Sequence, residues 1–201
     1  PFNGQTFVLV RLYQIPAESP LKPSMITYAT NSQNPVDLRD LRSNDEVQRR
    51  LEESMRLLGY EYRRQRSDAA PKPNEISVPT AAEAVLSVWR RKPQQAKFRE
   101  GEHFGKLYDA ISTPSLSAAQ VIIAVLLFRF AENRRKRPAE DSPRFVAYAS
   151  CFISMLMGEQ LLAELKIAPE KLDHLRFAEA KALFDSDGPR LYQDAITRIQ
   201  A

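Results

Sequence analysis

The chain has 201 residues, of which 43% are apolar and 27% charged, enough for one domain of ordinary size or two small ones. This composition excludes a disordered tail, and 6 glycines against 14 prolines exclude a collagen-like or low-complexity chain. The single cysteine, Cys151, can form no internal disulfide and no structural zinc cluster, so we expect an intracellular protein.

Signatures of enzyme chemistry are missing from the sequence. It contains no nucleophile elbow, phosphate-binding glycine loop, metal-binding helix motif or cysteine pair. His103 and His174 lie far apart without neighbouring ligands, and we expect both on helix surfaces. We therefore expect no cofactor and no metal, and we leave open whether the chain is an enzyme, with a binding role favoured.

The formal net charge is +4, and the basic excess lies in the first half of the chain. Residues 39–66 hold eight arginines, at positions 39, 42, 49, 50, 56, 63, 64 and 66, with six acidic residues among them. Because the arginine fork suits phosphate and carboxylate, an anionic partner is expected at this segment. The alternative is a helix face and a strand laced with surface ion pairs.

The chain opens with a predicted strand and a predicted helix. Residues 6–13 (TFVLVRLY) form a β-branched and aromatic run typical of a buried strand. Residues 21–30 have helical spacing, and Pro35 stops the helix after a polar string. One short helical turn is expected at residues 36–42.

The strongest local pattern is a helix that begins after Ser43 or Asn44 and ends at Gly59, where a left-handed cap belongs. Its acidic residues at positions 46 and 52 are spaced to pair with the arginines at 50 and 56. Its apolar stripe consists of Val47, Leu51, Met55 and Leu58. Residues 60–66 (YEYRRQR) alternate well enough to form a strand.

The second half is expected to be helical. Residues 67–75 contain two prolines and predict a boundary between a small α+β part, 1–75, and an α-helical part, 76–201. Thr80 is expected to cap a helix over residues 81–91, and further helices are predicted near residues 102–111, 169–184 and 189–199. The fold class is therefore α+β, with short N-terminal strands and helices followed by a mainly α-helical C-terminal part.

Two apolar stretches, residues 118–128 and 145–158, are too short to cross a membrane and predict a buried helical hairpin. Residues 132–138 between them are expected to form its solvated turn. The basic run 134–137 within this turn has a second interpretation, because four consecutive cations can contact phosphate. Cys151, Trp89, Met155 and Met157 are expected in the core.

A concentration of amides and charges surrounds the proline stop at residue 35. Amides crowded at such a stop either brace a loop through hydrogen bonds or contact a ligand. The sequence of residues 29–36 (ATNSQNPV), followed by Asp40-Leu41, Asn44-Asp45, Gln48 and residues 59–64 (GYEYRR), resembles the signature of the AIPR family, the abortive-infection phage-resistance proteins.

The resemblance covers residues 7–66 well and continues more weakly through residues 81–91, Pro93 and residues 104–108 (FGKLY). The opening residues 3–6 (NGQT) resemble an Asn-Gly-x-Gln-Thr element of the family, although the intervening residue is absent here. The resemblance implies a bacterial, cytoplasmic antiphage protein, and because the first residue is Pro1, we expect the chain to be the C-terminal portion of a longer one.

The first functional hypothesis is a nucleic-acid-binding or regulatory module, in which arginines contact the backbone and tyrosines stack on bases. The candidate binding residues are Asn31, Gln33, Asn34, Arg39, Arg42, Asn44, Tyr62, Arg63, Arg64 and Arg66. The second is a nucleotide-handling or nuclease-linked enzyme site, with Asp37, Asp40 and Asp45 as the candidate metal ligands. The third is a helical scaffold that docks a protein partner or a second copy. No membrane partner is expected.

Overall fold

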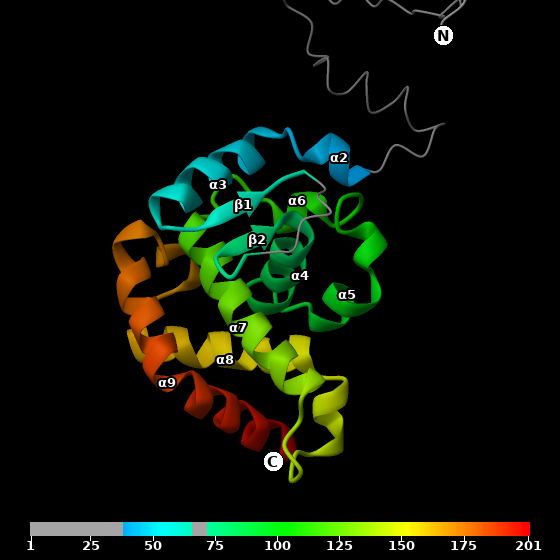
Figure 1. The fold of residues 1–201 in the computed structure, drawn as a ribbon, viewed down its shortest axis with the longest axis vertical. Coiled ribbons are helices and arrows are strands. Elements are labelled where there is room, and N and C mark those ends of the chain that lie inside the picture. The colour runs from blue at the N-terminus through cyan, green and yellow to red at the C-terminus, as the bar shows by residue number, and fades with distance from the viewer. Residues whose placement is uncertain (1–37, 66–71) are drawn as a thin grey trace, which may run out of the picture. The chain divides into compact units, whose positions relative to one another are not determined.

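The computed structural model describes residues 38–65 and 72–201, and residues Leu38–Ala201 form one compact unit (Figure 1). The strand expected at residues 6–13, the helix expected at 21–30 and the amides before Pro35 lie outside the described residues. Among the helices of the described part, none is long and apolar enough to span a membrane.

The described part is α+β, as predicted, with two short strands among helices and a helical C-terminal part. Its elements in chain order are α2 (Leu38–Arg42), α3 (Glu46–Leu57), β1 (Glu61–Arg63), β2 (Glu75–Ser77), α4 (Val78–Val88), α5 (Pro93–Phe98), η1 (Glu100–Glu102), α6 (Tyr108–Ile111), α7 (Ala118–Lys136), η2 (Arg144–Ala147), α8 (Ser150–Leu165), η3 (Pro169–Lys171) and α9 (His174–Gln200).

Helix α3 confirms the helix expected before Gly59, with a different first residue. Asp45 is the N-cap residue and makes no side-chain cap bond. Ser43 and Asp45 have other partners, because the Ser43 hydroxyl donates to the Asp40 carbonyl and the Asp45 carboxylate pairs with Arg42 at 3.2 Å. At the other end Gly59 has a φ of +81°, which confirms the left-handed cap.

The prediction that the acidic residues at 46 and 52 pair with the arginines at 50 and 56 along α3 is wrong. Arg50 donates to the backbone carbonyls of Pro114 and Leu116, the latter at 2.9 Å, and so ties α3 to the chain before α7. Glu52 pairs with Arg64, the residue after β1, at 2.9 Å. Both charges thus make tertiary contacts, which outweigh the weak pairing of neighbours on an exposed helix face.

The strand expected over residues 60–66 is confirmed over the shorter span of β1. It pairs in parallel with β2, with Tyr62 opposite Ile76. Tyr62 and Ile76 are both buried, so the two-stranded sheet contributes one side chain from each strand to the core. β1 lies before the boundary expected at residue 75, and β2 spans it.

Helix α4 begins earlier than expected, because Ser77 rather than Thr80 is its N-cap and accepts a bond from the Thr80 backbone N–H. Pro79 sits in the first turn, where no intrahelical N–H bond is needed. The single helix expected over residues 102–111 is also wrong. In this span η1 ends at Glu102, residues 103–107 form turns, and α6 covers only Tyr108–Ile111.

Helices α7 and α8 confirm the helical hairpin and most of its burial, although Tyr148 and Phe152 of the second apolar stretch are exposed. α7 starts with a capping box, in which Ser117 accepts from the Gln120 N–H at 3.0 Å and Gln120 accepts from the Ser117 N–H at 2.7 Å. The turn expected at residues 132–138 is largely helix, since α7 continues to Lys136. Arg135 pairs with Glu132 one turn back, and cations near a helix C-terminus are favourable.

Helix α9 is one helix where two were expected, and Pro189 lies inside it. Asp173 caps it by accepting the N–H groups of Leu175 and Arg176. The helix packs along both α7 and α8, and buried Leu191, Ala195 and Ile196 follow the proline. This tertiary packing outweighs the hydrogen bond that proline removes.

The core lies between α4, α7 and α8, which pack against one another in pairs. Cys151, Trp89, Met155 and Met157 are buried there, as expected. Helices α4 and α8 approach closely at Gly158, where an added Cβ would lie 2.5 Å from Val88 Cγ1 and 3.3 Å from a Trp89 ring carbon.

We expect the Gly158→Ala substitution to lower the free energy of unfolding, measured by urea denaturation. Overpacking costs about 1–3 kcal/mol, of which up to about 1 kcal/mol is offset by alanine's better helix propensity. Gly101→Ala is the matched control, because nothing lies within 4 Å of its added Cβ. Wild-type stability in Gly158→Ala would contradict close packing of α4 and α8.

Candidate functional site

The structure describes six of the ten predicted binding residues. Arg39 and Arg42 lie on α2, and Asn44 lies just before α3. Tyr62 and Arg63 lie on β1, and Arg64 follows it. The other four, Asn31, Gln33, Asn34 and Arg66, lie outside the described residues.

A buried hydrogen-bond network forms around Gln48, which is only 2% exposed. The Tyr62 hydroxyl donates to Gln48 Oε1 at 2.7 Å. Gln48 Nε2 donates to the Tyr108 hydroxyl at 3.2 Å and to the Ser112 hydroxyl at 3.1 Å. One amide therefore joins α3, β1 and the α6 region, and we call these four residues the Gln48 network.

Both tyrosines of the Gln48 network are held in the neutral, hydrogen-bonding form. Burial raises the pKa of Tyr62 far above its ordinary value. Burial, opposed by the bond from Gln48, raises the pKa of Tyr108 to about 12, and a hydrogen bond to Asp45 acts in the same direction as burial. The Arg42 guanidinium lies 4.4 Å from the Tyr108 ring centroid and also pairs with Asp45.

Arg64 links the same elements from the outside. Its Nε donates to Glu52 at 2.9 Å, and its Nη1 donates to the Ser43 carbonyl at 2.6 Å and to the Asn44 side chain at 3.3 Å. Arg64 thereby satisfies a backbone acceptor in the link between α2 and α3. Its contacts are those of a brace, and its removal would strand Glu52 and that carbonyl.

Arg63 reaches across the sheet to Glu75, with its Nη1 3.0 Å from Glu75 Oε1. Glu75 is only 5% exposed, so a paired cation is needed beside its carboxylate. Arg129 of α7 donates to the Glu75 backbone carbonyl at 2.6 Å. This arrangement anchors β1 and β2 to α7.

These contacts give Arg42, Tyr62, Arg63 and Arg64 structural roles in the described part of the chain. Gln48 and Gly59 also belong to the resemblance. Gln48 joins α3 to β1 and to the α6 region, and Gly59 ends α3 just before β1. Ligand binding by the ten predicted residues stays a prediction.

Of the three carboxylates in the enzyme hypothesis, the structure describes Asp40 and Asp45. Asp37 lies outside the described residues, and Asp45 is engaged by Arg42 and Tyr108. Among residues 38–65 and 72–201, no group of three or more His, Cys, Asp or Glu side chains is placed to hold a metal ion.

The surface prediction for His103 is wrong, whereas His174 is exposed at the start of α9. His103 is 3% exposed, its Nε2 has no hydrogen-bond partner, and it lines the same small cavity as Gln48 and Tyr108. Burial lowers the pKa of His103, although hydrogen bonds to the Gln95 and Ala96 backbone and the charge of Glu100 oppose this.

Two surface features went unnoticed in the sequence. The first is a group of exposed aromatic side chains, Phe98, Tyr148 and Phe152, near the basic C-terminal turn of α7. The second is a groove of about 580 Å³ between α3, residues 114–119 and the start of α9, with the exposed side chain of Leu57 in its wall. A phenylalanine between two cations, as in the sequence Lys97-Phe98-Arg99, was the available signal for the first.

We expect Gln48→Leu to destabilise the fold, because it leaves the Tyr62, Tyr108 and Ser112 hydroxyls without their amide partner. The expected loss is about 1–3 kcal/mol for each hydroxyl left unsatisfied, measured by urea denaturation. Gln94→Leu on the exposed face of α5 is the matched control. Equal stability of the two variants would show that the Gln48 network contributes nothing.

We also expect His103 to make the free energy of unfolding depend on pH. Folding lowers the pKa of His103 from 6.5, so the neutral imidazole contributes fully to the free energy of unfolding above about pH 6.5. This contribution is lost as the pH falls toward the pKa of His103 in the folded state. His103→Gln should therefore flatten the free energy of unfolding between pH 7.5 and 5.5, relative to wild type. His174→Gln should leave that dependence as it is, and identical curves for wild type and His103→Gln would contradict the burial of a neutral imidazole.

Comparison with known proteins gives a family match. A model of the AIPR protein family matches residues 3–199, nearly the whole chain. No curated protein and no solved structure matches the chain. The match includes the Gln48 network and the braces at Arg63 and Arg64, so the features built above lie inside the family region. The chain belongs to the AIPR family, the abortive-infection phage-resistance proteins, and this membership supports a role in antiphage defence.

Proposed function

We propose that this chain serves antiphage defence as a nucleic-acid-binding module, with phosphate contacts at the basic end of α7, defined as Arg134, Arg135, Lys136 and Arg137. The observation that carries this proposal is the concentration of cations there. Three of the four lie in the last turn of α7, and Arg137 follows as the C-cap residue.

The last turn of α7 carries more basic residues than the last turns of α8 and α9, the other long helices of the described part. The last turn of α8 has no basic residue and that of α9 has only Arg198. One or two cations satisfy a helix C-terminus, and the effect is worth only about 0.3–1 kcal/mol each at a surface. Arg134 also lies over the Phe130 ring and Arg135 pairs with Glu132, so Lys136 and Arg137 are the cations of this run that helix termination and local contacts explain least.

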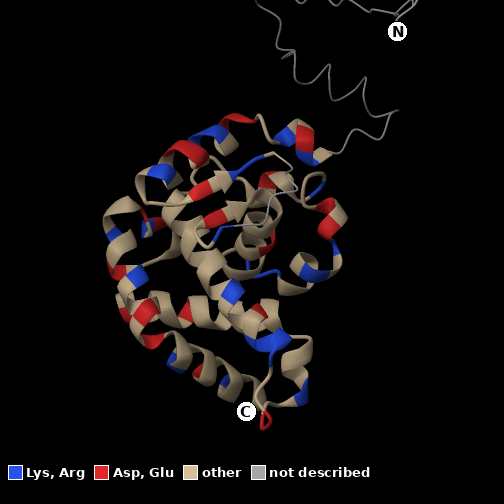
Figure 2. Ribbon diagram, in the orientation of Figure 1, with Lys and Arg blue, Asp and Glu red and all other residues tan. Residues whose placement is uncertain are grey.

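The run is only partly neutralised by its neighbours. Glu132 pairs closely with Arg135 and lies 3.9 Å from Lys136, whose side chain remains 62% exposed. Arg144 adds an exposed cation from η2, which packs against α7. Figure 2 shows these basic segments at the end of α7 and on η2. Phosphates are the complementary charge, and their binding would release counterions.

The arginine segment supports the proposal less directly. Arg42, Arg63 and Arg64 make internal contacts, and using them for phosphate would compete with Asp45, Glu75 and Glu52. The basic end of α7 is therefore our first choice for the phosphate contacts. Binding at residues 39–66 remains the alternative location and is tested in the same experiment.

A helical protein-interaction scaffold is the second candidate function. The observation in its favour is the groove beside α3, with Leu57 84% exposed in its wall and Leu175, beside the wall residue His174, 75% exposed. Leu57→Arg should disrupt a complex held by this groove, and unchanged assembly in light scattering would count against the scaffold. Nuclease-linked chemistry at Asp37, Asp40 and Asp45 has no such observation and stays a hypothesis.

We expect the chain to bind labelled DNA or RNA with an affinity that falls steeply as salt rises. The triple substitution Lys136→Gln, Arg137→Gln and Arg144→Gln should weaken binding and lower the slope of log affinity against log salt by about 2, since each phosphate contact contributes about 0.7 on single strands. These three side chains are exposed, so the fold should persist.

The matched control replaces three exposed lysines elsewhere, Lys106, Lys166 and Lys171, by Gln and changes net charge equally. If both triple variants weaken binding alike, only net charge matters and the proposed location is wrong. If wild type fails to bind DNA and RNA even at low salt, the proposed function is wrong.

A further inference from the structure

The aromatic side chains beside the basic end of α7 are unusually exposed. Phe98 is 82% exposed, Tyr148 is 84% exposed and Phe152 is 40% exposed. Fully burying such a side chain stabilises a fold by about 1.5–3 kcal/mol, and the fold forgoes most of this at Phe98 and Tyr148 and part of it at Phe152. Other aromatic side chains, such as Phe104 and Phe145, pack against the core. Single exposed rings are common, but a group at one end of a molecule marks an interaction site.

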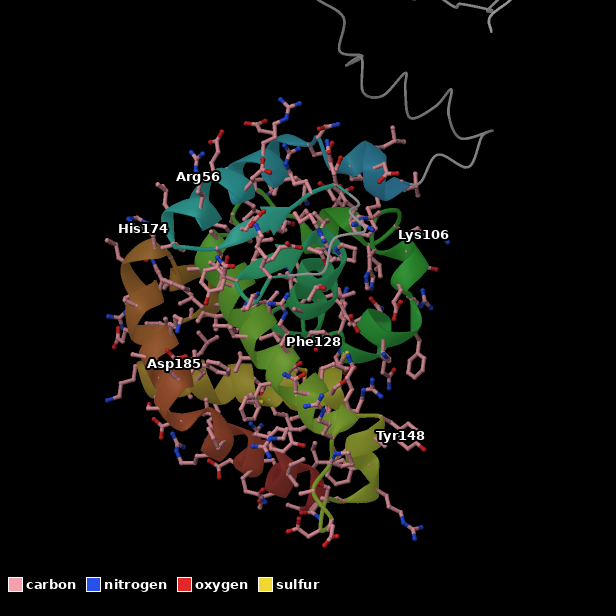
Figure 3. All side chains as sticks on the ribbon, in the orientation of Figure 1. Arg56, Lys106, Phe128, Tyr148, His174 and Asp185 are labelled. Carbon is pink, nitrogen blue, oxygen red and sulfur yellow. The ribbon has the colours of Figure 1, made fainter. Side chains whose placement is uncertain are left out.

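The three aromatic residues belong to neighbouring elements. Phe98 ends α5, Tyr148 follows η2, and Phe152 lies in the first turn of α8, while α5 packs against α8. Burial raises the pKa of Cys151 to about 12, and the charge of Lys97 opposes this, which agrees with the packing of α5 against α8. Figure 3 shows Tyr148 pointing away from the body of the molecule.

Cations are interleaved with these rings. Lys97 precedes Phe98, Arg144 lies four residues before Tyr148, and Lys136 lies one turn after Glu132 on α7. Rings alternating with cations form the surface that proteins use for single-stranded nucleic acids, because unpaired bases stack on the rings while the backbone follows the positive charge. Bases in a duplex are already stacked on each other and cannot use such rings.

We infer that Phe98, Tyr148 and Phe152 form a stacking surface for single-stranded nucleic acid, and that bases lie on these rings while phosphates contact the basic end of α7. This inference rests on the proposed nucleic-acid binding and names its substrate class and its site. A protein partner would use the same rings without the cations and without sensitivity to salt.

The test measures binding of a fluorescein-labelled oligo(dT), and of the same strand annealed to oligo(dA), to the full chain. Phe98→Ala combined with Tyr148→Ala should weaken oligo(dT) binding on the order of 25-fold, from about fivefold or more for each ring. The salt slope should stay at the wild-type value, because no phosphate contact is removed. Phe98→Trp combined with Tyr148→Trp should retain the affinity.

The matched control is Leu57→Ala combined with Leu175→Ala, which removes two equally exposed apolar side chains outside this surface. An oligonucleotide containing 2-aminopurine adds a direct readout, since its fluorescence falls when the base stacks on a ring. That quenching should occur with wild type and the Trp variant and disappear with the Ala variant.

The possible outcomes distinguish a failure of the stacking surface from a failure of the proposed nucleic-acid binding. If wild type binds oligo(dT) and the Ala variant binds equally well, the stacking surface is wrong and nucleic-acid binding stands. Equal losses for oligo(dT) and for the duplex would overturn the preference for single strands. No binding by wild type to any nucleic acid would overturn both proposals.

Discussion

The fold depends on one buried amide. Gln48 cannot stay in an apolar interior unless its oxygen and its NH₂ group are both satisfied, and the Tyr62, Tyr108 and Ser112 hydroxyls do this. These partners come from elements up to 64 residues away in the chain, so satisfying one side chain fixes α3, β1 and α6 together. A polar network of this kind specifies a single arrangement, because every displaced element leaves a buried polar group without a partner.

The charged side chains of the family signature extend that constraint outward. Arg64 ties the link before α3 to the end of β1, and Arg63 neutralises the buried Glu75 beside α7. Among the described residues that carry the resemblance to the AIPR family, Gln48, Arg63 and Arg64 hold the small sheet against the helices. Exposed rings and the exposed cations Lys136 and Arg137 lie instead near the far end of α7, where Arg134 contacts the Phe130 ring and Arg135 pairs with Glu132.

The sequence predicted the features of the fold that depend on neighbouring residues alone. Gly59, the stripe of α3 and the apolar hairpin of α7 and α8 were found because a left-handed cap, helical spacing and continuous apolar runs each have a local cause. Long-range contacts decided the rest. Pro189 was expected to begin a separate helix, yet α9 packs against two helices and continues through it. The site was harder to predict, because the partners of Arg63 and Arg64 and the burial of His103 depend on tertiary contacts. For Phe98 the two flanking cations were a local signal of exposure.

Hydrogen–deuterium exchange with and without oligo(dT) tests the account most directly, because it locates binding on the intact chain without any substitution. The account predicts that oligo(dT) slows exchange around residues 97–99, 134–137 and 144–152. It also predicts that α3 and β1 exchange slowly in both states, as expected for elements held by the Gln48 network. Protection confined to residues 38–65 would contradict it, since the family signature would then be the binding surface rather than the brace.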